Sequence, residues 1–170
     1  MCSSDLAIVL AEEIAGMDAG GRTFLELGCG LGLPSLVARR VGFRATATDY
    51  EETALEGVRY AAARNGIADL ATRVVDWRCP PEDLGTFDLV VAANVLHATP
   101  DVRRSLRHAK SLLRPGGLLL LNEIARAHLF THLTFGLLEG WWLYEDAELR
   151  LPGCPALAAE GWRQIGRAHV

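Results

Sequence analysis

Apolar residues follow two spacings along this chain, short continuous runs and helical repeats. Five short segments are predicted to be strands, and they cover residues 23–27, 45–49, 72–77, 87–93 and 118–124, of which 87–93 is a near-continuous apolar run. Between them, apolar positions recur every three or four residues, which predicts helices over 7–17, 34–41, 51–64 and 100–113. This alternation predicts an α/β fold, in which right-handed crossovers build a mostly parallel, doubly wound sheet.

The predicted helix after residue 99 has the clearest start and stop signals. Thr99 is expected to be its N-cap, because a threonine hydroxyl can accept a hydrogen bond from a free N–H of the first turn. Pro100 then takes the first helical position, where its missing N–H costs nothing. The Arg-Pro-Gly-Gly sequence at 114–117 is expected to end the helix, so that the fifth strand begins at Leu118.

Length and composition predict one domain over residues 1–170, because half of the chain is apolar and can form a single core. The net charge of -4, from 17 basic and 21 acidic residues, argues against nucleic-acid binding, which needs a basic face. No apolar run reaches the roughly 20 residues that cross a bilayer, and no signal-peptide pattern opens the sequence. We therefore expect a cytoplasmic protein without nucleic-acid or membrane partners.

The cysteine pattern argues against a metal site and against a disulfide framework. The four cysteines lie far apart in the sequence, with no Cys-x-x-Cys pair and no Cys/His cluster. They are expected to be reduced thiols, and they are Cys2, Cys29, Cys79 and Cys154.

Both ends of the chain carry a sign of non-native origin. Codons that fit residues 2–6 have a reverse complement that encodes residues 164–168, an inverted repeat typical of sequencing-adapter read-through. We hypothesise that about residues 1–6 and 164–170 are not native and that the chain is a fragment of a longer gene; coincidence is the alternative. A source locus that continues in frame without this repeat would confirm the hypothesis.

The glycine-rich turn after the first predicted strand is the main candidate for ligand binding. Gly28, Gly30 and Gly32 alternate along it, and without a Cβ the backbone can pass close to a ligand. A Gly-x-Gly-x-x-Gly dinucleotide fingerprint is not met, because Leu33 occupies its last position, and an NAD-dependent oxidoreductase is therefore disfavoured. The carboxylate of Glu26 would repel a pyrophosphate, whereas it suits a cationic or amino-bearing ligand.

Other polar residues follow the carboxyl ends of further predicted strands. Asp49 ends the second strand, where a carboxylate can accept two hydrogen bonds from a ribose diol; a helix cap is the alternative role. Asp76 and Trp77 end the third strand, where they can bind and cover an adenine ring; core packing is the alternative for Trp77. Ligands of doubly wound sheets bind beyond these ends, and the residues expected there are Glu26, Asp49, Asp76, Asn94, His97 and Glu123.

The segment 26–32 resembles the Glu/Asp-x-Gly-x-Gly-x-Gly motif of class I S-adenosylmethionine-dependent methyltransferases. The resemblance implies a Rossmann-like fold and S-adenosyl-L-methionine as cofactor, with the glycine turn under the amino-acid part of the cofactor. It also implies that Asp49 binds the ribose and that Tyr50 flanks the adenine. The cofactor site implied in this way comprises Glu26, Gly28, Cys29, Gly30, Gly32, Asp49, Tyr50, Asp76, Trp77 and Asn94.

Residues 92–99, 112–117 and 133–142 resemble the C-methyltransferase domains of modular polyketide synthases. The resemblance implies that His97 and Glu123 form a catalytic dyad acting on a small-molecule or carrier-protein-bound acyl substrate. His97 would remove the α-proton of a β-ketoacyl thioester, and Glu123 would fix the tautomer of the ring and stabilise the imidazolium. Without the resemblance, a single histidine after a strand is more often structural.

The first half of the chain resembles a different group. Residues 25–36, 47–51 and 76–77 are similar to small stand-alone methyltransferases of the protein-lysine and nicotinamide type. The chain is then a natural mosaic, or an assembly joined two genes near residues 84–95. The alternative functions are therefore an N-methyltransferase for protein lysine or a small amine and, from another class, a fragment that binds cofactor without catalysis.

The part after the fifth predicted strand is expected to be incomplete and to carry a lid. Class I methyltransferases continue with a helix and two more strands, whereas here residues 156–164 only begin such a helix, so the fold is expected to be truncated and of poor stability. An aromatic-rich stretch is expected to form a substrate-side lid, or alternatively to pack on the sheet, and it contains Phe130, Phe135, Trp141, Trp142 and Tyr144.

Overall fold

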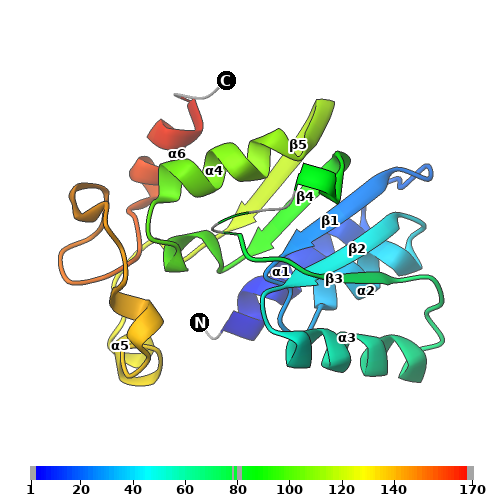
Figure 1. Ribbon diagram of the computed structural model, residues 1–170, viewed down its shortest axis with the longest axis horizontal. Helices are drawn as coiled ribbons and strands as arrows, with labels where there is room; N and C mark the ends of the chain where they lie inside the picture. The colour runs from blue at the N-terminus through cyan, green and yellow to red at the C-terminus, as the bar shows by residue number, and fades with distance from the viewer. Residues whose placement is uncertain (1–2, 78, 80–81, 168–170) are drawn as a thin grey trace.

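The computed structural model describes residues 3–77, 79 and 82–167, so Cys2 and the outermost residues of the suspected non-native ends lie outside it. Five parallel strands form one sheet in the order β3-β2-β1-β4-β5 (Figure 1). The predicted doubly wound α/β fold is confirmed. The strands are β1 (Thr23–Leu27), β2 (Arg44–Asp49), β3 (Ala71–Val74), β4 (Phe87–Ala93) and β5 (Leu113–Asn122).

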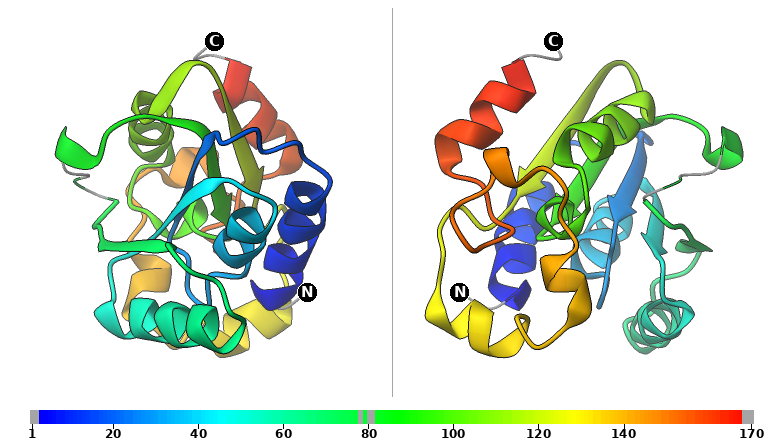
Figure 2. Two further views of the ribbon diagram at one scale, coloured as in Figure 1. Left: turned by 90° about the vertical axis from the view of Figure 1, so that its right-hand side faces the viewer. Right: turned by 60° about the vertical axis from the view of Figure 1, so that its left-hand side comes forward.

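Helices cover both faces of the sheet, and the side-chain alternation of β1 shows why (Figure 2). Leu25 and Leu27 point into one core cluster with residues of α4 and α6. Phe24, one residue out of phase, points into the other cluster with residues of α1 and α2. The helices are α1 (Ser3–Ala15), α2 (Leu33–Arg40), α3 (Glu52–Arg64), α4 (Val102–Ser111), α5 (Leu129–Thr134) and α6 (Ala159–Arg167).

The strand order reverses between β1 and β4. The chain first runs outward from β1 to β3, and then returns to place β4 on the other side of β1. In open parallel sheets the ligand crevice lies at this reversal, beyond the carboxyl ends of the strands. The ends of β1 and β4 are in register here, since Leu27 pairs with Ala92.

The N-cap of α4 is Asp101, and the prediction of Thr99 was wrong. The Asp101 side chain accepts a hydrogen bond of 2.9 Å from the backbone N–H of Arg104. A carboxylate also interacts favourably with the positive end of a helix, which a hydroxyl does not. Thr99 lies before the helix, where its hydroxyl donates to the carbonyl of Leu96 at 2.7 Å.

Strands β3 and β5 have different bounds from the predicted ones. β5 begins at Leu113, because the Arg-Pro-Gly-Gly sequence is absorbed as an irregular stretch opposite Phe87 and Leu89 of β4. Pro115 is tolerated there, since the outer edge of β5 has no strand partner within the described residues. β3 ends at Val74, so that residues 76 and 77 follow the strand instead of forming its end.

A segment rich in short helical turns connects β5 to α6 and lies near the carboxyl ends of the strands (Figure 1). It contains α5 and the 3-10 turns η3 (Glu139–Trp142) and η4 (Ala147–Leu149). Two further 3-10 turns, η1 (Glu82–Leu84) and η2 (Leu96–Ala98), flank β4. Among the described helices, none combines the length and the apolar character that a bilayer crossing requires.

Candidate active site at the carboxyl ends of the strands

The three glycines after β1 have different structural roles. All three have left-handed backbone angles, with φ of 57° at Gly28, 50° at Gly30 and 69° at Gly32. A Cβ on Gly28 would lie 2.8 Å from Val95, and one on Gly32 would lie 2.6 Å from Val58. A Cβ on Gly30 would have no atom within 4 Å. The protein's own packing therefore requires two of the glycines, and open space lies over the third.

The Asp49 carboxylate connects the glycine turn to the start of α3. One oxygen accepts a hydrogen bond of 2.9 Å from the N–H of Gly30, and the other accepts one of 3.1 Å from the N–H of Glu51. The helix-cap alternative is thus partly realised, because Glu51 is the N-cap residue of α3. A carboxylate has about four lone-pair positions, so two remain for hydroxyl donors. The adjacent Tyr50 is exposed.

Glu26 belongs to β1, and its side chain is buried against the first turn of α2. It is 1% exposed, and it accepts hydrogen bonds from the backbone N–H and the hydroxyl of Ser35, at 2.9 and 2.5 Å. Burial raises the pKa of this carboxyl to about 8; the charge of Asp49 adds to the rise, and the bonds from Ser35 oppose it. At neutral pH the group is therefore mostly protonated, unless a cation approaches it.

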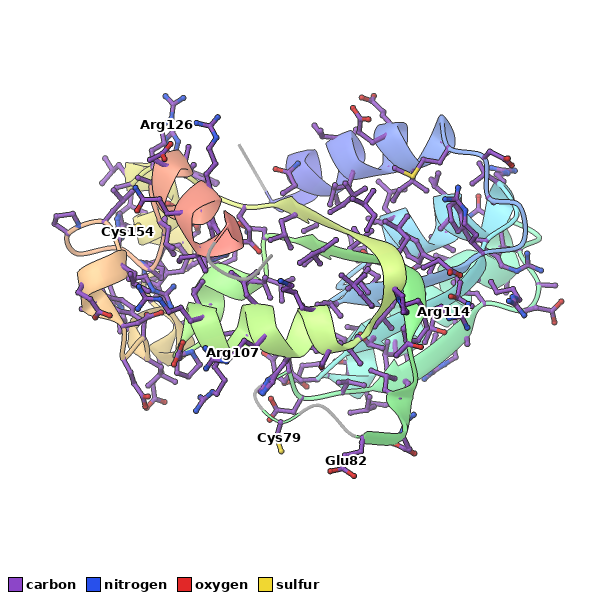
Figure 3. All side chains as sticks on the ribbon, turned by 90° about the horizontal axis from the view of Figure 1, so that it is seen from above. Cys79, Glu82, Arg107, Arg114, Arg126 and Cys154 are labelled. Atoms are coloured by element: carbon purple, nitrogen blue, oxygen red, sulfur yellow. The ribbon has the colours of Figure 1, made fainter. Side chains whose placement is uncertain are left out.

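Cys29 is an unreactive small residue of the turn. Its side chain is buried, and burial together with the neighbouring carboxyls raises the pKa of the thiol. The described cysteines are free, and Figure 3 shows Cys79 and Cys154 on different sides of the molecule. Within residues 3–77, 79 and 82–167, no group of three or more His, Cys, Asp or Glu side chains could hold a metal ion.

The residues after β3 do not form an open adenine platform. Trp77 is 7% exposed and belongs to the core cluster that contains Leu25 and Leu27. The core-packing alternative is therefore the observed one, although the buried Nε1 of Trp77 has no hydrogen-bond partner. Adenine contact by this ring stays a prediction. The partly buried Asp76 lies directly before it.

Asn94 has the geometry of a strained binding residue at the end of β4. Its φ of 61° is left-handed, which is uncommon for a residue with a Cβ. Its side-chain carbonyl oxygen is buried and has no hydrogen-bond partner. Strain and an unpaired buried polar atom each destabilise the fold by about 1–3 kcal/mol, and they cluster at ligand sites. Asn94 is therefore the predicted cofactor residue whose geometry most clearly indicates a missing partner.

His97 and Glu123 form the expected pair. One oxygen of Glu123 lies 2.8 Å from Nδ1 of His97. The other accepts backbone N–H bonds from Val95 and Leu96, at 2.9 and 2.7 Å. Both side chains are only 3% exposed. Because a carboxylate can only accept, Nδ1 carries the proton in this bond, and Nε2 is left as the basic nitrogen.

The predicted lid residues reach His97 through one tryptophan. The ring of Trp141 meets the His97 ring edge-on, with centroids 5.8 Å apart. Phe135 stacks on Trp141, and His132 meets it edge-on, both at 5.8 Å. The lid thus covers the dyad directly in this structure. By contrast, Phe130 and Trp142 are largely exposed.

Sequence reasoning missed a buried ion pair beside the dyad. Arg150 and Asp146 are each 7% exposed, and they meet at 2.5 Å. The Arg150 guanidinium also donates to the carbonyl of His97. An Asp and an Arg four positions apart are common on protein surfaces, so the sequence carried no signal for their burial.

Residues 25–119 match the protein family described as "Methyltransferase domain", which is more than half of the chain. The chain belongs to this family. The prediction of a methyltransferase is thereby confirmed.

Similar proteins of known sequence include two bacterial polyketide synthases. Polyketide synthase PksR of Bacillus subtilis (strain 168) is 59% identical over 83 residues, which cover 49% of this chain and 3% of that protein. Polyketide synthase ThaQ of Burkholderia thailandensis (strain ATCC 700388 / DSM 13276 / CCUG 48851 / CIP 106301 / E264) is 40% identical over 156 residues, 85% of this chain and 7% of that protein. This methyltransferase domain therefore spans a small part of either relative, and the similarity to polyketide synthases extends well beyond half of it.

The solved structure of the CurJ carbon methyltransferase, in selenomethionine form, is also similar. Its TM-score is 0.80 at 28% sequence identity, and the match covers 98% of this chain and 46% of that one. The predicted Rossmann-like methyltransferase fold is confirmed by this match and by the strand order. The idea of a mosaic or joined gene stays a hypothesis.

The raised pKa of Glu26 predicts how the stability of this methyltransferase domain depends on pH. The folded state keeps a proton that the unfolded state releases above its ordinary pKa of 4.5, so the free energy of unfolding should fall as pH rises toward about 8. The slope due to this group is about 1.4 kcal/mol per pH unit. Glu26→Gln, which cannot titrate, should lose that slope in urea unfolding between about pH 5.5 and about pH 7.5.

The matched control is Glu12→Gln on the exposed face of α1, which should keep the wild-type slope. Equal slopes for the wild type and Glu26→Gln would show that Glu26 is not a buried neutral carboxyl.

Proposed function

We propose that this domain is an S-adenosylmethionine-dependent C-methyltransferase that methylates the α-carbon of a β-ketoacyl thioester in polyketide-type biosynthesis. The carrying observation is the buried pair of His97 and Glu123, 2.8 Å apart, at the carboxyl end of β4 beside the glycine turn. Carbon methylation requires a base, because the α-carbon is not nucleophilic until it loses a proton. The polyketide synthases and the carbon methyltransferase to which the chain is similar support this acceptor class.

The residues present fit the proposed cofactor. The unpaired buried oxygen of Asn94 indicates a missing neighbour at the reversal of the strand order, and the open space over Gly30 leaves room for one. Asp49 would hold the ribose with its free lone pairs, and Glu26 would face the cationic amino-acid part. When bound, the cofactor supplies an electrophilic methyl group. The predicted set of Glu26, Gly28, Cys29, Gly30, Gly32, Asp49, Tyr50, Asp76, Trp77 and Asn94 remains our proposal for this site, and Trp77 is its weakest member.

His97 is the proposed base, acting through Nε2. The proton moves from the α-carbon to Nε2, and the C–H electron pair passes into the enolate. The enolate carbon would then take the methyl group as its bond to the cofactor's sulfur breaks, so that the electron pair of that bond stays on sulfur and S-adenosylhomocysteine leaves. The Nδ1 proton stays on His97 and is hydrogen-bonded to Glu123 throughout, so that the imidazolium forms next to a carboxylate. The N–H groups of Val95 and Leu96 fix that carboxylate in place.

The aromatic residues that cover His97 favour an acyl substrate with an apolar part. Because His97 is 3% exposed, a substrate reaches its ring only when a covering side chain such as Trp141 moves. The displaced aromatic surface of Trp141 and Phe135 then offers an apolar wall to the chain of a small or carrier-bound thioester. We place this reaction in the cytoplasm.

The test offers two acceptors in parallel, a β-ketoacyl thioester and a lysine-bearing peptide, with methyl-labelled S-adenosylmethionine. We expect label on the α-carbon of the thioester and none on the peptide. Labelling of the lysine amine alone would favour the N-methyltransferase alternative. Cofactor binding without transfer to either acceptor would favour the non-catalytic fragment.

A further inference from the structure

We infer that Arg150 is a positioning residue, which holds the backbone of His97 so that the ring can act as a base. This inference rests on the proposed function of His97. The side chain of Arg150 has no exposed surface, although it comes from the turn-rich segment far from β4 in the sequence. Its contacts are directed at the loop that carries the proposed base.

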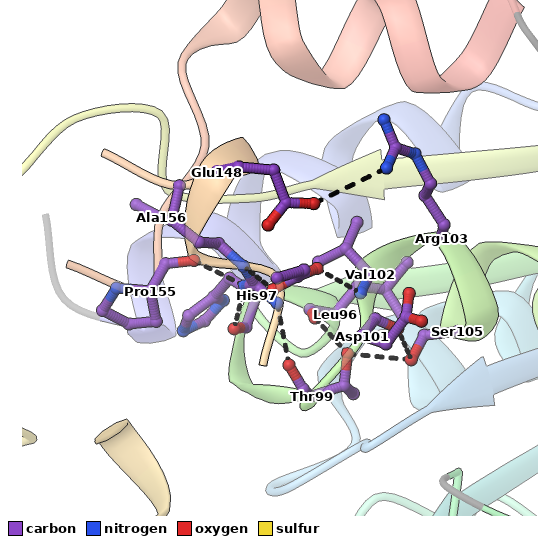
Figure 4. Close-up of polar contacts among 12 residues, drawn as sticks. Leu96, His97, Thr99, Asp101, Val102, Arg103, Ser105, Glu148, Pro155 and Ala156 are labelled. Atoms are coloured by element: carbon purple, nitrogen blue, oxygen red, sulfur yellow. Dashed lines mark hydrogen bonds and ion pairs between the residues drawn. The ribbon is translucent and has the colours of Figure 1, made fainter. Parts of the chain in front are cut away.

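The guanidinium binds that loop at two carbonyl groups and joins it to Pro155. One terminal nitrogen lies 2.6 Å from the carbonyl oxygens of both His97 and Pro155. The other terminal nitrogen donates to the carbonyl of Thr99 at 2.9 Å. Figure 4 labels the three residues whose carbonyl groups accept these bonds, His97, Thr99 and Pro155. The η2 turn is therefore bound through its backbone on either side of residue 98.

Asp146 completes the clamp and extends it to α4. One oxygen accepts from Nε of Arg150 at 2.5 Å, and the other accepts from the N–H of Val102 at 2.8 Å. A buried guanidinium without a counter-charge would be strongly destabilising, so the carboxylate keeps the arginine in place. The pair thus fixes the loop relative to the first turn of α4.

His97 is held from opposite ends of the residue by two groups. Glu123 fixes the ring through Nδ1, and Arg150 fixes the main chain through the carbonyl oxygen. With only the ring contact, the loop could shift and carry Nε2 away from the α-proton. A misplacement of about 1 Å can lower a rate about 10²-fold, which is the scale of the effect that we assign to this clamp.

Only an arginine can make this set of contacts. The four acceptors lie around one planar group, and a guanidinium presents five N–H donors in a fixed fork. A lysine at the same position keeps the charge but has three donors on one nitrogen. Arg150→Lys is therefore the variant that separates charge from geometry. A matched control is Arg103→Lys, because Arg103 forms a 3.8 Å pair with Glu148 that is largely exposed.

The experiment measures three properties of the full chain: the single-turnover rate on a β-ketoacyl thioester, the Kd for S-adenosylhomocysteine, and the NMR resonance of the His97 Nδ1 proton. We expect Arg150→Lys to lower the rate about 10²-fold and to leave the Kd within about twofold. The Nδ1 proton resonance should broaden or shift, because the main chain of His97 can then move and change the geometry of the bond between its ring and Glu123. Guanidinium ion added to Arg150→Ala should restore part of the rate, whereas Arg103→Lys should behave as the wild type.

A wild-type rate together with an unchanged Nδ1 resonance in Arg150→Lys would overturn the inference. A wild type that transfers no methyl group would instead overturn the proposed function, and the resonance would still report whether Arg150 holds His97. If the lysine variant does not fold, Asp146→Asn keeps the guanidinium and weakens the clamp. Asp146→Asn should lower the single-turnover rate by less than the roughly 10²-fold expected for Arg150→Lys. A rate equal to that of the wild type would also overturn the inference.

Discussion

His97→Ala is expected to lower the methyl-transfer rate on a β-ketoacyl thioester by about 10²–10⁴-fold, which is the usual contribution of a positioned general base. The affinity for S-adenosylhomocysteine should stay near the wild-type value, because the contacts of Asp49 with the glycine turn do not involve His97. The rate comes from single-turnover kinetics, and the affinity comes from calorimetry.

Glu123→Gln is the companion variant. Its amide oxygen can accept only some of the three hydrogen bonds that Glu123 accepts from Val95, Leu96 and His97. We expect a smaller rate loss than for His97→Ala, with the cofactor affinity retained. A His97→Ala domain with wild-type turnover would remove the dyad from the mechanism.

Alanine at Gly32 and alanine at Gly30 are expected to act on different properties. Both residues are left-handed, so alanine at either destabilises the fold by about 1–2 kcal/mol. At Gly32 the new methyl group also overlaps Val58, which adds about 1–3 kcal/mol of overpacking. At Gly30 it enters open space, where the proposed cofactor passes, so the affinity for S-adenosylhomocysteine should fall about tenfold or more.

Urea unfolding and calorimetry on the two variants give the comparison. Gly32→Ala should have the lower free energy of unfolding. Gly30→Ala should be the more stable of the two and should still bind S-adenosylhomocysteine more weakly than the wild type. A Gly30→Ala domain that binds cofactor as the wild type does would show that the turn does not lie under the ligand.

The strands could be predicted because their signal is local. A parallel strand covered on both faces is mostly apolar, as residues 87–93 are apart from Asp88, and its length follows from the run. The early start of β5 could not be predicted in this way. Pro115 and Gly116 are a stop signal by themselves, and only pairing with β4 makes them part of an irregular strand. The cap of α4 was missed for a related reason, since Thr99 and Asp101 are both good capping residues.

The site could be predicted where a residue's role follows from its place at a strand end. Asp49 and Glu123 directly end or follow strands, and parallel strands bring such ends together. The sequence left core packing of Trp77 open as an alternative but could not decide for it, because β3 stops before this residue and the chain turns the ring into the core. Arg150 was missed since its contacts with His97 join positions more than fifty residues apart.

The carboxyl ends of β1 and β4, where the strand order reverses, are proposed to bind S-adenosylmethionine and not a dinucleotide. Calorimetric titration of the full chain with S-adenosylhomocysteine, and in parallel with NAD, tests this proposal most directly. We predict saturable binding of S-adenosylhomocysteine at one site, weakened by Asp49→Ala, and no heat with NAD. Binding of NAD with no heat from S-adenosylhomocysteine would contradict the account.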